Sequence, residues 1–182
     1  MNRDDKHIIR KVLCGESGEY VHILNRYGQQ VFNLVVHIVS NREDAEELTQ
    51  DIFMKAFRQL SSFKEESSFS TWLYRIATNT ALTAVRKRRY DKIRLDENAY
   101  IDITDELIDE SLDNDCEEQL QRLSQAIDKL NAEERAIITL YYMDERPIAE
   151  VATIMSMTES NIKIKLYRTR KRLYLLLNDR KS

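Results

Sequence analysis

The sequence predicts an all-α protein of two small helical domains joined by a flexible acidic linker. Its 182 residues include three Gly and one Pro, the residue types that most often interrupt helices and form tight turns. Apolar residues recur at steps of three and four along most of the chain, which is the period of a helix with one buried face. Because a domain of about a hundred residues is ordinary, this length accommodates two compact helical units.

The first domain is predicted to span residues 1–90 and to contain three helices. Apolar periodicity indicates a long helix over residues 20–39. Asn41 followed by Asp44 has the spacing of an N-cap and an acidic N3 residue, and a second apolar stripe then runs to about residue 60. The serine-rich stretch 61–70 is predicted to be an ordered loop, because serine side chains compete for backbone hydrogen bonds. A third helix starts near Trp72 and runs into a basic cluster.

The linker is predicted to span residues 91–116 and the second domain residues 117–182. In the second domain, apolar stripes predict a helix from about residue 117 to 130 and a short helix over 136–141. Pro147 suits the first position of a further helix, which ends near Met155. A three-residue turn follows, with Thr158 as the N-cap of a last helix over 159–177. Two helices joined by such a turn form a helix-turn-helix.

Charge is distributed unevenly along the chain. The net charge of -3 alone discourages a nucleic-acid partner, but eleven Asp and Glu residues and no Lys or Arg lie between residues 96 and 118. Basic segments lie on both sides, over residues 86–94 and 163–181. Two basic segments that flank an acidic connector are typical of two nucleic-acid-binding modules joined by a linker.

Catalytic and metal sites are not indicated by the sequence. Cys14 and Cys116 lie far apart without a CxxC spacing, and the three histidines fit no metal-ligand pattern. Because the chain offers no combination of nucleophile, base and oxyanion donor, we expect no enzymatic activity, no metal and no cofactor. No stretch approaches 20 apolar residues, so we expect no membrane insertion and a location in the reducing cytoplasm.

The last helix has the two faces of a DNA-recognition helix. Its apolar stripe is formed by Ile162, Leu166, Thr169, Leu173 and Leu176. The opposite face carries hydroxyl, cationic and aromatic side chains, namely Ser160, Lys163, Ile164, Tyr167, Arg168 and Lys171. A cationic face is also typical of an ordinary solvated surface, but the helix-turn-helix geometry favours DNA binding, in which cations contact phosphates and residues near the N-terminus contact bases.

Long motifs resemble the extracytoplasmic-function (ECF) sigma factors. DAEELTQDIF over residues 44–53, TWLYRIATN over 71–79 and the helix-turn-helix sequence occur in the order typical of that family, and the resemblance covers about residues 18–177. It implies sigma region 2 in the first domain, sigma region 4 in the second, and a role in recruiting RNA polymerase to promoters. The partners it implies are core RNA polymerase, promoter DNA and an anti-sigma factor.

The resemblance also implies three sets of contact residues. Polymerase binding is expected at Asp44, Glu47, Gln50, Asp51 and Met54. Contacts with the −10 element, including an extruded base, are expected at Ser61, Phe63, Lys64, Ser67, Ser68, Asn79, Arg86, Lys87, Arg88 and Arg89. Contacts with the −35 element are expected at Thr158, Glu159, Ser160, Asn161, Lys163, Ile164, Lys165, Tyr167, Arg168 and Lys171.

Some alternatives stay open at this point. Phe69 and Trp72 could stack on bases, but large aromatics at helical spacing more often belong to a core. A two-domain repressor or response regulator would also carry a C-terminal helix-turn-helix, although the N-terminal half lacks the strands of a receiver domain. The chain departs from the family at Ser156, where Gly is frequent, and at Pro147; Ser156 is strained if the turn requires a left-handed conformation.

Overall fold

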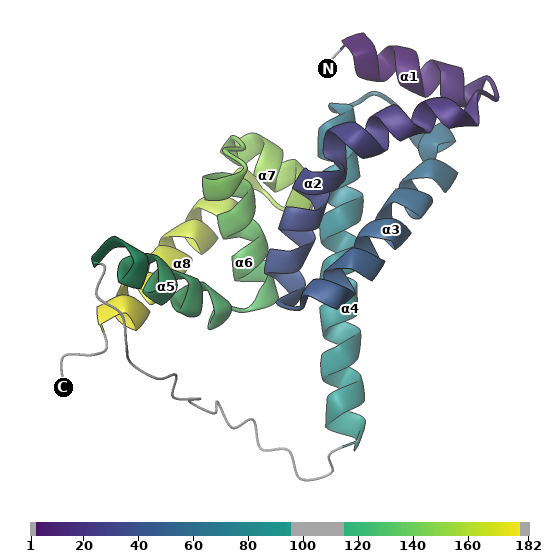
Figure 1. The fold of residues 1–182 in the computed structure, drawn as a ribbon. Coiled ribbons are helices and arrows are strands. Elements are labelled where there is room, and N and C mark those ends of the chain that lie inside the picture. Colours follow the sequence, from purple (N-terminus) through teal and green to yellow (C-terminus); the bar gives the residue numbers. More distant parts are fainter. Residues whose placement is uncertain (1–2, 96–114, 179–182) are drawn as a thin grey trace.

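The computed structural model describes residues 3–95 and 115–178, and these residues form helices, turns and no strands (Figure 1). The elements in chain order are α1 (Arg3–Leu13), the 3₁₀ turn η1 (Ser17–Glu19), α2 (Tyr20–Val39), α3 (Arg42–Arg58), η2 (Leu60–Ser62), α4 (Phe69–Leu95), α5 (Asp115–Asp128), α6 (Ala132–Ile138), the π-helical turn η3 (Thr139–Met143), α7 (Ile148–Met155) and α8 (Glu159–Asn178). The predicted all-α class is confirmed. The expected flexibility of the linker falls mostly on residues 96–114, which lie outside the described residues.

The first module is built on α2, α3 and α4, which pack against one another. The predicted α2 stripe is the centre of this module, since Val31, Leu34 and Val35 are fully buried. Ser40 ends α2 in a left-handed conformation at φ 54°, and the Asn41 side chain then accepts a hydrogen bond of 2.9 Å from the Asp44 amide. This cap starts α3 where the sequence predicts it.

Helix α1 was not predicted, because charged residues interrupt its apolar positions. It packs on α2 by burying Ile8, Ile9 and Val12. Asp5 is 2% exposed, pairs with Arg26 and accepts a hydrogen bond of 2.6 Å from the Tyr27 hydroxyl. Burial of a carboxylate is costly unless it is paired and hydrogen-bonded, and α2 supplies both partners.

The second module contains the predicted helix-turn-helix. Asn131 and Glu134 form a reciprocal capping box at the start of α6, with bonds of 2.9 and 3.0 Å. Pro147 lies one residue earlier than predicted, at the N-cap of α7 with ψ 150°. The turn does require a left-handed residue, because Ser156 ends α7 at φ 55° and ψ 43°. Thr158 accepts a hydrogen bond of 3.2 Å from the Asn161 amide and so caps α8.

The two modules pack against each other, with α6 against α2 and α7 against α4 (Figure 1). Their buried apolar residues form one continuous core, from Ile8 of α1 to Leu166 of α8. The sequence does not predict this arrangement, since nothing in it sets the relative orientation of two modules joined by a linker.

Arg135 of α6 joins the modules through backbone carbonyls. Its guanidinium donates to the carbonyls of His37 and Ile38 at the end of α2, both at 2.7 Å. It also donates to Leu130 at 2.6 Å and to Asp128 at 3.3 Å, where α5 ends. The last carbonyls of a helix lack partners within the helix and carry partial negative charge. One cation therefore caps the C-termini of two helices, one from each module.

Candidate nucleic-acid interface

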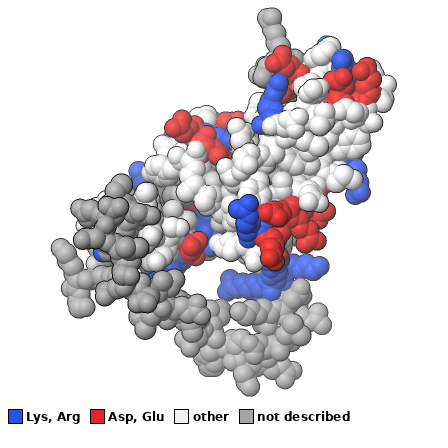
Figure 2. All heavy atoms as spheres, in the orientation of Figure 1, with Lys and Arg blue, Asp and Glu red and all other residues white. Residues whose placement is uncertain are grey.

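The outward face of α3 carries the expected polymerase contacts. Glu47, Gln50, Asp51 and Met54 are all exposed, while Ala45, Ile52 and Ala56 on the opposite side are fully buried. Neither Glu47 nor Asp51 has an ion-pair or hydrogen-bond partner within the described residues. Figure 2 shows this region as Asp and Glu side chains at the start of α3, beside a broad uncharged surface over α2 and α3. The face can therefore meet a partner without breaking internal contacts.

Asp44 differs from the other expected polymerase contacts. It is half-buried and forms an ion pair with Arg88 of α4, one of the residues expected to bind DNA. The acidic start of α3 thus borders the basic part of α4, as Figure 2 shows. The structure connects these two expected surfaces through one charge pair.

The loop over residues 61–70 has both exposed and structural members. Ser61 and Lys64 are exposed, while Phe63, Ser67 and Ser68 are half-buried. Ser68 caps α4, because its hydroxyl accepts a hydrogen bond of 3.1 Å from the Thr71 amide. Phe63, Phe69 and Trp72 form an aromatic cluster with ring centroids 5.4 to 5.6 Å apart. Phe69 is fully buried, so it belongs to the core and does not stack on bases in this conformation.

Asn79 lies exposed on α4, one helical turn before Thr83. Its backbone carbonyl accepts a hydrogen bond of 2.7 Å from the Thr83 hydroxyl, and its side-chain amide has no hydrogen-bond partner within the described residues. Farther along α4, Arg86, Lys87, Arg88 and Arg89 are all exposed. The structure therefore aligns a free amide with a group of cations along one helix.

Sequence reasoning missed a contact that holds this loop. Lys6 of α1 binds Glu65 at 2.6 Å, and this hydrogen bond holds the pKa of Glu65 below its usual value. Glu65 has φ 57°, a left-handed conformation that marks the tip of the loop. Neither residue belongs to a motif that would reveal the pair, because the two lie 59 positions apart.

Helix α8 has the two predicted faces. Ile162, Leu166 and Thr169 are buried against the rest of the second module, and Leu173 and Leu176 are half-buried. The outward side is formed by the exposed residues Thr158, Glu159, Ser160, Asn161, Lys163, Ile164, Tyr167, Arg168 and Lys171. The N-terminal half of the helix therefore presents a continuous polar and cationic surface.

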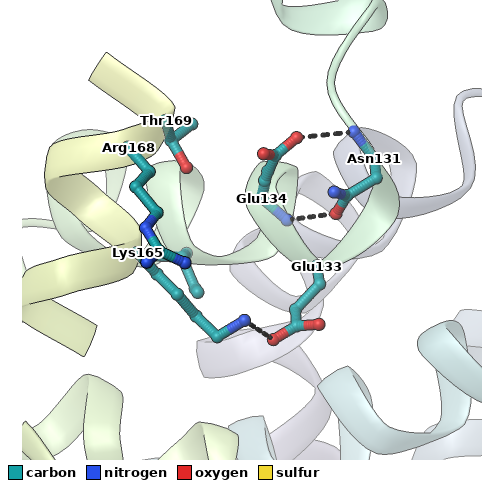
Figure 3. A pocket seen from close by; sticks show the side chains of 7 residues that line it. Asn131, Glu133, Glu134, Lys165, Arg168 and Thr169 are labelled. Carbon is teal, nitrogen blue, oxygen red and sulfur yellow. Dashed lines mark hydrogen bonds and ion pairs between the residues drawn. The ribbon is translucent and has the colours of Figure 1, made fainter. Parts of the chain in front are cut away.

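Lys165 is the exception among the expected −35 contacts. It is half-buried and turns toward α6, where its ammonium group lies 2.8 Å from Glu133 (Figure 3). Lys165, Arg168 and Thr169 of α8 line a cavity of about 150 Å³ together with Glu133 and Glu134 of α6 and Asn131, the N-cap of α6. The structure thus places Lys165 in a contact between helices, while Lys163 is exposed.

Comparisons with known proteins identify both modules. Residues 23–90 match the family Sigma-70 region 2, and residues 120–173 match Sigma-70, region 4. The ECF RNA polymerase sigma-E factor of Haemophilus influenzae is 31% identical over 91% of this chain and 91% of its own length. The chain belongs to the ECF RNA polymerase sigma factors. The ECF RNA polymerase sigma factor SigW of Bacillus subtilis is 29% identical over 96% of this chain and 97% of its own length.

Solved structures agree with this fold. The sigma factor RpoE of Bartonella quintana, crystallised with the anti-sigma factor NepR, has a TM-score of 0.68 at 24% identity. The match covers 90% of this chain and 99% of that one.

This sigma factor therefore acts in transcription initiation, and core RNA polymerase and promoter DNA are its partners. The family match decides against an operator-binding repressor. None of the helices in the described ranges is both long and apolar enough to cross a membrane.

Proposed function

We propose that this sigma factor divides promoter recognition among three surfaces. The outward face of α3, with Asp44, Glu47, Gln50, Asp51 and Met54, binds core polymerase. The loop over 61–70, Asn79 and Arg86 to Arg89 hold the −10 element, and the exposed side of α8 reads the −35 element. The separation of these surfaces on three different helices supports this division, because one molecule must contact polymerase and two DNA elements together.

The two faces of α8 carry the proposal for the −35 element. Ile162, Leu166 and Thr169 fix the rotation of the helix by their burial, so Lys163 is held outward one turn from the N-terminus. A cation at this place in a recognition helix reaches base edges in the major groove, where guanine offers two acceptors. Lys171 lies two turns farther along and meets backbone phosphate.

Replacement of Lys163 or Lys171 by Ala tests this orientation. Lys163→Ala should cost about 1–3 kcal/mol of binding and relax the preference at one or two base pairs. Lys171→Ala is the matched control, because it removes the same charge. It should weaken binding to all sequences alike and reduce the slope of log affinity against log salt concentration by about one. The measurement is holoenzyme binding to a randomised −35 library at several salt concentrations. An unchanged base preference for Lys163→Ala would show that the helix is oriented differently.

For the −10 element, the exposed amide of Asn79 supports capture of an extruded base. An amide donates and accepts at once, so it can pair with the edge of a base that has left the stack. The cations Arg86 to Arg89 lie about two to three turns farther along α4 and suit backbone phosphate. Arg88 must first leave Asp44 to do so.

Three further features complete the proposal. The protein performs no chemistry of its own and works in the cytoplasm, beside the polymerase that it recruits. An anti-sigma factor holds it inactive, in keeping with the complex of the Bartonella quintana sigma factor with NepR. Co-purification of the tagged chain from its native cells tests this partner, since a stoichiometric second protein that blocks polymerase binding is expected.

A further inference from the structure

Helix α1 has a fixed place beside the loop over residues 61–70. It packs on α2 and on η2, the turn with which the loop begins (Figure 1). Asp5 of α1 is 2% exposed and is held by Arg26 and by the Tyr27 hydroxyl, both of α2. A buried carboxylate that loses such partners is strongly destabilised, so α1 cannot slide along α2 without a large cost. The backbone of the next residue, Lys6, is therefore fixed relative to α2.

One connection from α1 to the loop is an ion pair. The Lys6 ammonium group lies 2.6 Å from the carboxylate of Glu65, at the tip of the loop. This hydrogen bond chiefly lowers the pKa of Glu65, and the charges of Lys6 and Arg10 lower it further. Two cations of α1 therefore act on a single carboxylate of the loop.

The other connection consists of aromatic rings. Tyr27, which binds the buried Asp5, has its ring centroid 5.8 Å from that of Phe69. Phe69 in turn lies 5.6 Å from Phe63 of the loop and 5.6 Å from Trp72. Aromatic pairs at these separations attract each other, and Phe69 is fully buried. The start of α1 and the start of the loop therefore share one packed base.

The middle of the loop has few contacts of its own. Phe63 belongs to the aromatic cluster and Ser68 caps α4, so both ends are fixed. Within the described residues, the Lys6–Glu65 pair is the one hydrogen bond or ion pair that joins residues 64–67 to another element. Glu65 is also held at φ 57°, which is unfavourable for a residue with a Cβ. The conformation of this stretch therefore depends on support from α1.

We propose that α1 positions the −10 loop, defined as residues 61–70, and that Lys6 is the positioning residue. This step rests on the assignment of the loop to the −10 element under the proposed function. Lys6 acts through Glu65 and does not touch DNA. The pair keeps Lys64 and Ser67 in place before an extruded base arrives, and a site that is ordered in advance loses less entropy when it binds.

Four variants of the full chain test this role. Lys6→Met and Glu65→Ala each remove one partner, and Glu65→Ala keeps a Cβ, so the strain at φ 57° is unchanged. Lys6→Glu with Glu65→Lys restores an ion pair of reversed sense. Lys11→Met is the matched control, because Lys11 lies on the same helix but pairs with Glu19 at 3.3 Å and not with the loop.

The first measurement follows the loop in the free protein. Trp72 is the single tryptophan of the chain, and its ring centroid lies 5.4 Å from that of Phe63. Quenching of its fluorescence by acrylamide therefore reports how well the loop covers it. Lys6→Met and Glu65→Ala should increase the quenching constant, whereas Lys11→Met and the reversed pair should keep the wild-type value.

The second measurement is promoter opening by the holoenzyme, read from permanganate footprints as the ratio of open to closed complexes. Lys6→Met and Glu65→Ala should each lower this ratio about two- to fivefold, the range of an exposed ion pair. The loss in the double variant should equal that of either single one, because the two residues act as a unit. A direct contact of Lys6 with phosphate predicts the opposite for Glu65→Ala, since removal of a negative charge strengthens DNA binding.

The outcomes separate this inference from the proposed function. Wild-type quenching in both single variants, or a rise in opening for Glu65→Ala, overturns the positioning role of Lys6. Increased quenching with unchanged opening also overturns it if Asn79→Ala still lowers opening, because the −10 assignment then stands without the loop conformation. If Asn79→Ala leaves opening unchanged as well, the −10 assignment itself is wrong and the inference fails with it. Recovery of both quantities by the reversed pair supports it.

Discussion

Loss of the Arg135 guanidinium should uncouple the two modules. Arg135→Met keeps an unbranched apolar stem at a site that is 9% exposed, but removes the donors to four carbonyls. Two of these carbonyls belong to the last turn of α2, and the other two lie at the end of α5 and just after it. Burial lowers the pKa of Arg135, but arginine stays protonated in proteins, so the site holds a charge in the native protein.

The magnitude follows from the geometry of these bonds. Each hydrogen bond to a charged donor contributes about 1.5–3 kcal/mol, and the three bonds of 2.6 to 2.7 Å are the strong ones. Methionine recovers part of this free energy, because it avoids burying a charge. We therefore expect a loss of about 3–5 kcal/mol, against a total stability of about 5–15 kcal/mol for a typical protein. The melting temperature should fall by about 10 °C in a chain of this size.

Urea unfolding followed by circular dichroism measures this change. The wild type should unfold in one transition, since its modules share one core, whereas Arg135→Met should show two. Arg172→Met is the matched control, because Arg172 is exposed and its bonds to Glu134 and Lys129 are 3.1 and 3.3 Å long. It should cost about 0–1 kcal/mol. A loss below about 1 kcal/mol in Arg135→Met, with one transition, would refute the assignment of Arg135 as the cap of both helices.

Four further outcomes are expected. The double variant Glu47→Lys with Asp51→Lys should abolish polymerase binding in a pull-down and leave the melting temperature unchanged, because both side chains are exposed and unpaired within the described residues. The control Glu16→Lys with Glu145→Lys should bind polymerase normally, and unchanged affinity of the Glu47 and Asp51 double variant would contradict the polymerase face. Asn79→Ala should reduce promoter opening in permanganate footprints more than closed-complex binding, Asn33→Ala should reduce neither, and equal losses for Asn79→Ala would count against base capture. Ser156→Gly should stabilise the protein by roughly 0.5–1 kcal/mol in urea unfolding, because glycine adopts φ 55° without a Cβ penalty. A destabilised variant would show that the Ser156 side chain contributes more stability than its backbone conformation costs. Burial lowers the pKa of His37, and the net result stays below the usual value although Asp128 raises it, because Arg135 lowers it as well. As the pH drops below about 6.5, the unfolded chain therefore binds a proton at His37 before the folded chain does, and the stability of the protein should fall. If a His37→Gln variant loses the same stability between about pH 7.5 and 5.5, His37 is not the cause.

The elements that the sequence predicts are those with a local signal. The stripes of α2 and α8 and the cap at Asn41 depend on residues within one or two turns, and each is found within about two residues of its expected bounds. Helix α1 was missed because its apolar face is narrow and becomes meaningful only against α2. The π-helical turn over Thr139–Met143 was missed too, since no residue pattern distinguishes it from the helix that it extends.

The candidate site was predictable to a similar extent. The exposure of Glu47, Asn79 and Lys163 follows from their place on a helical wheel. The inward turn of Lys165 does not, because it depends on Glu133, 32 residues away on another helix. The double cap by Arg135 gives no sequence signal at all. Its acceptors on α2 are backbone carbonyls 97 and 98 positions away, and every residue type has such a carbonyl.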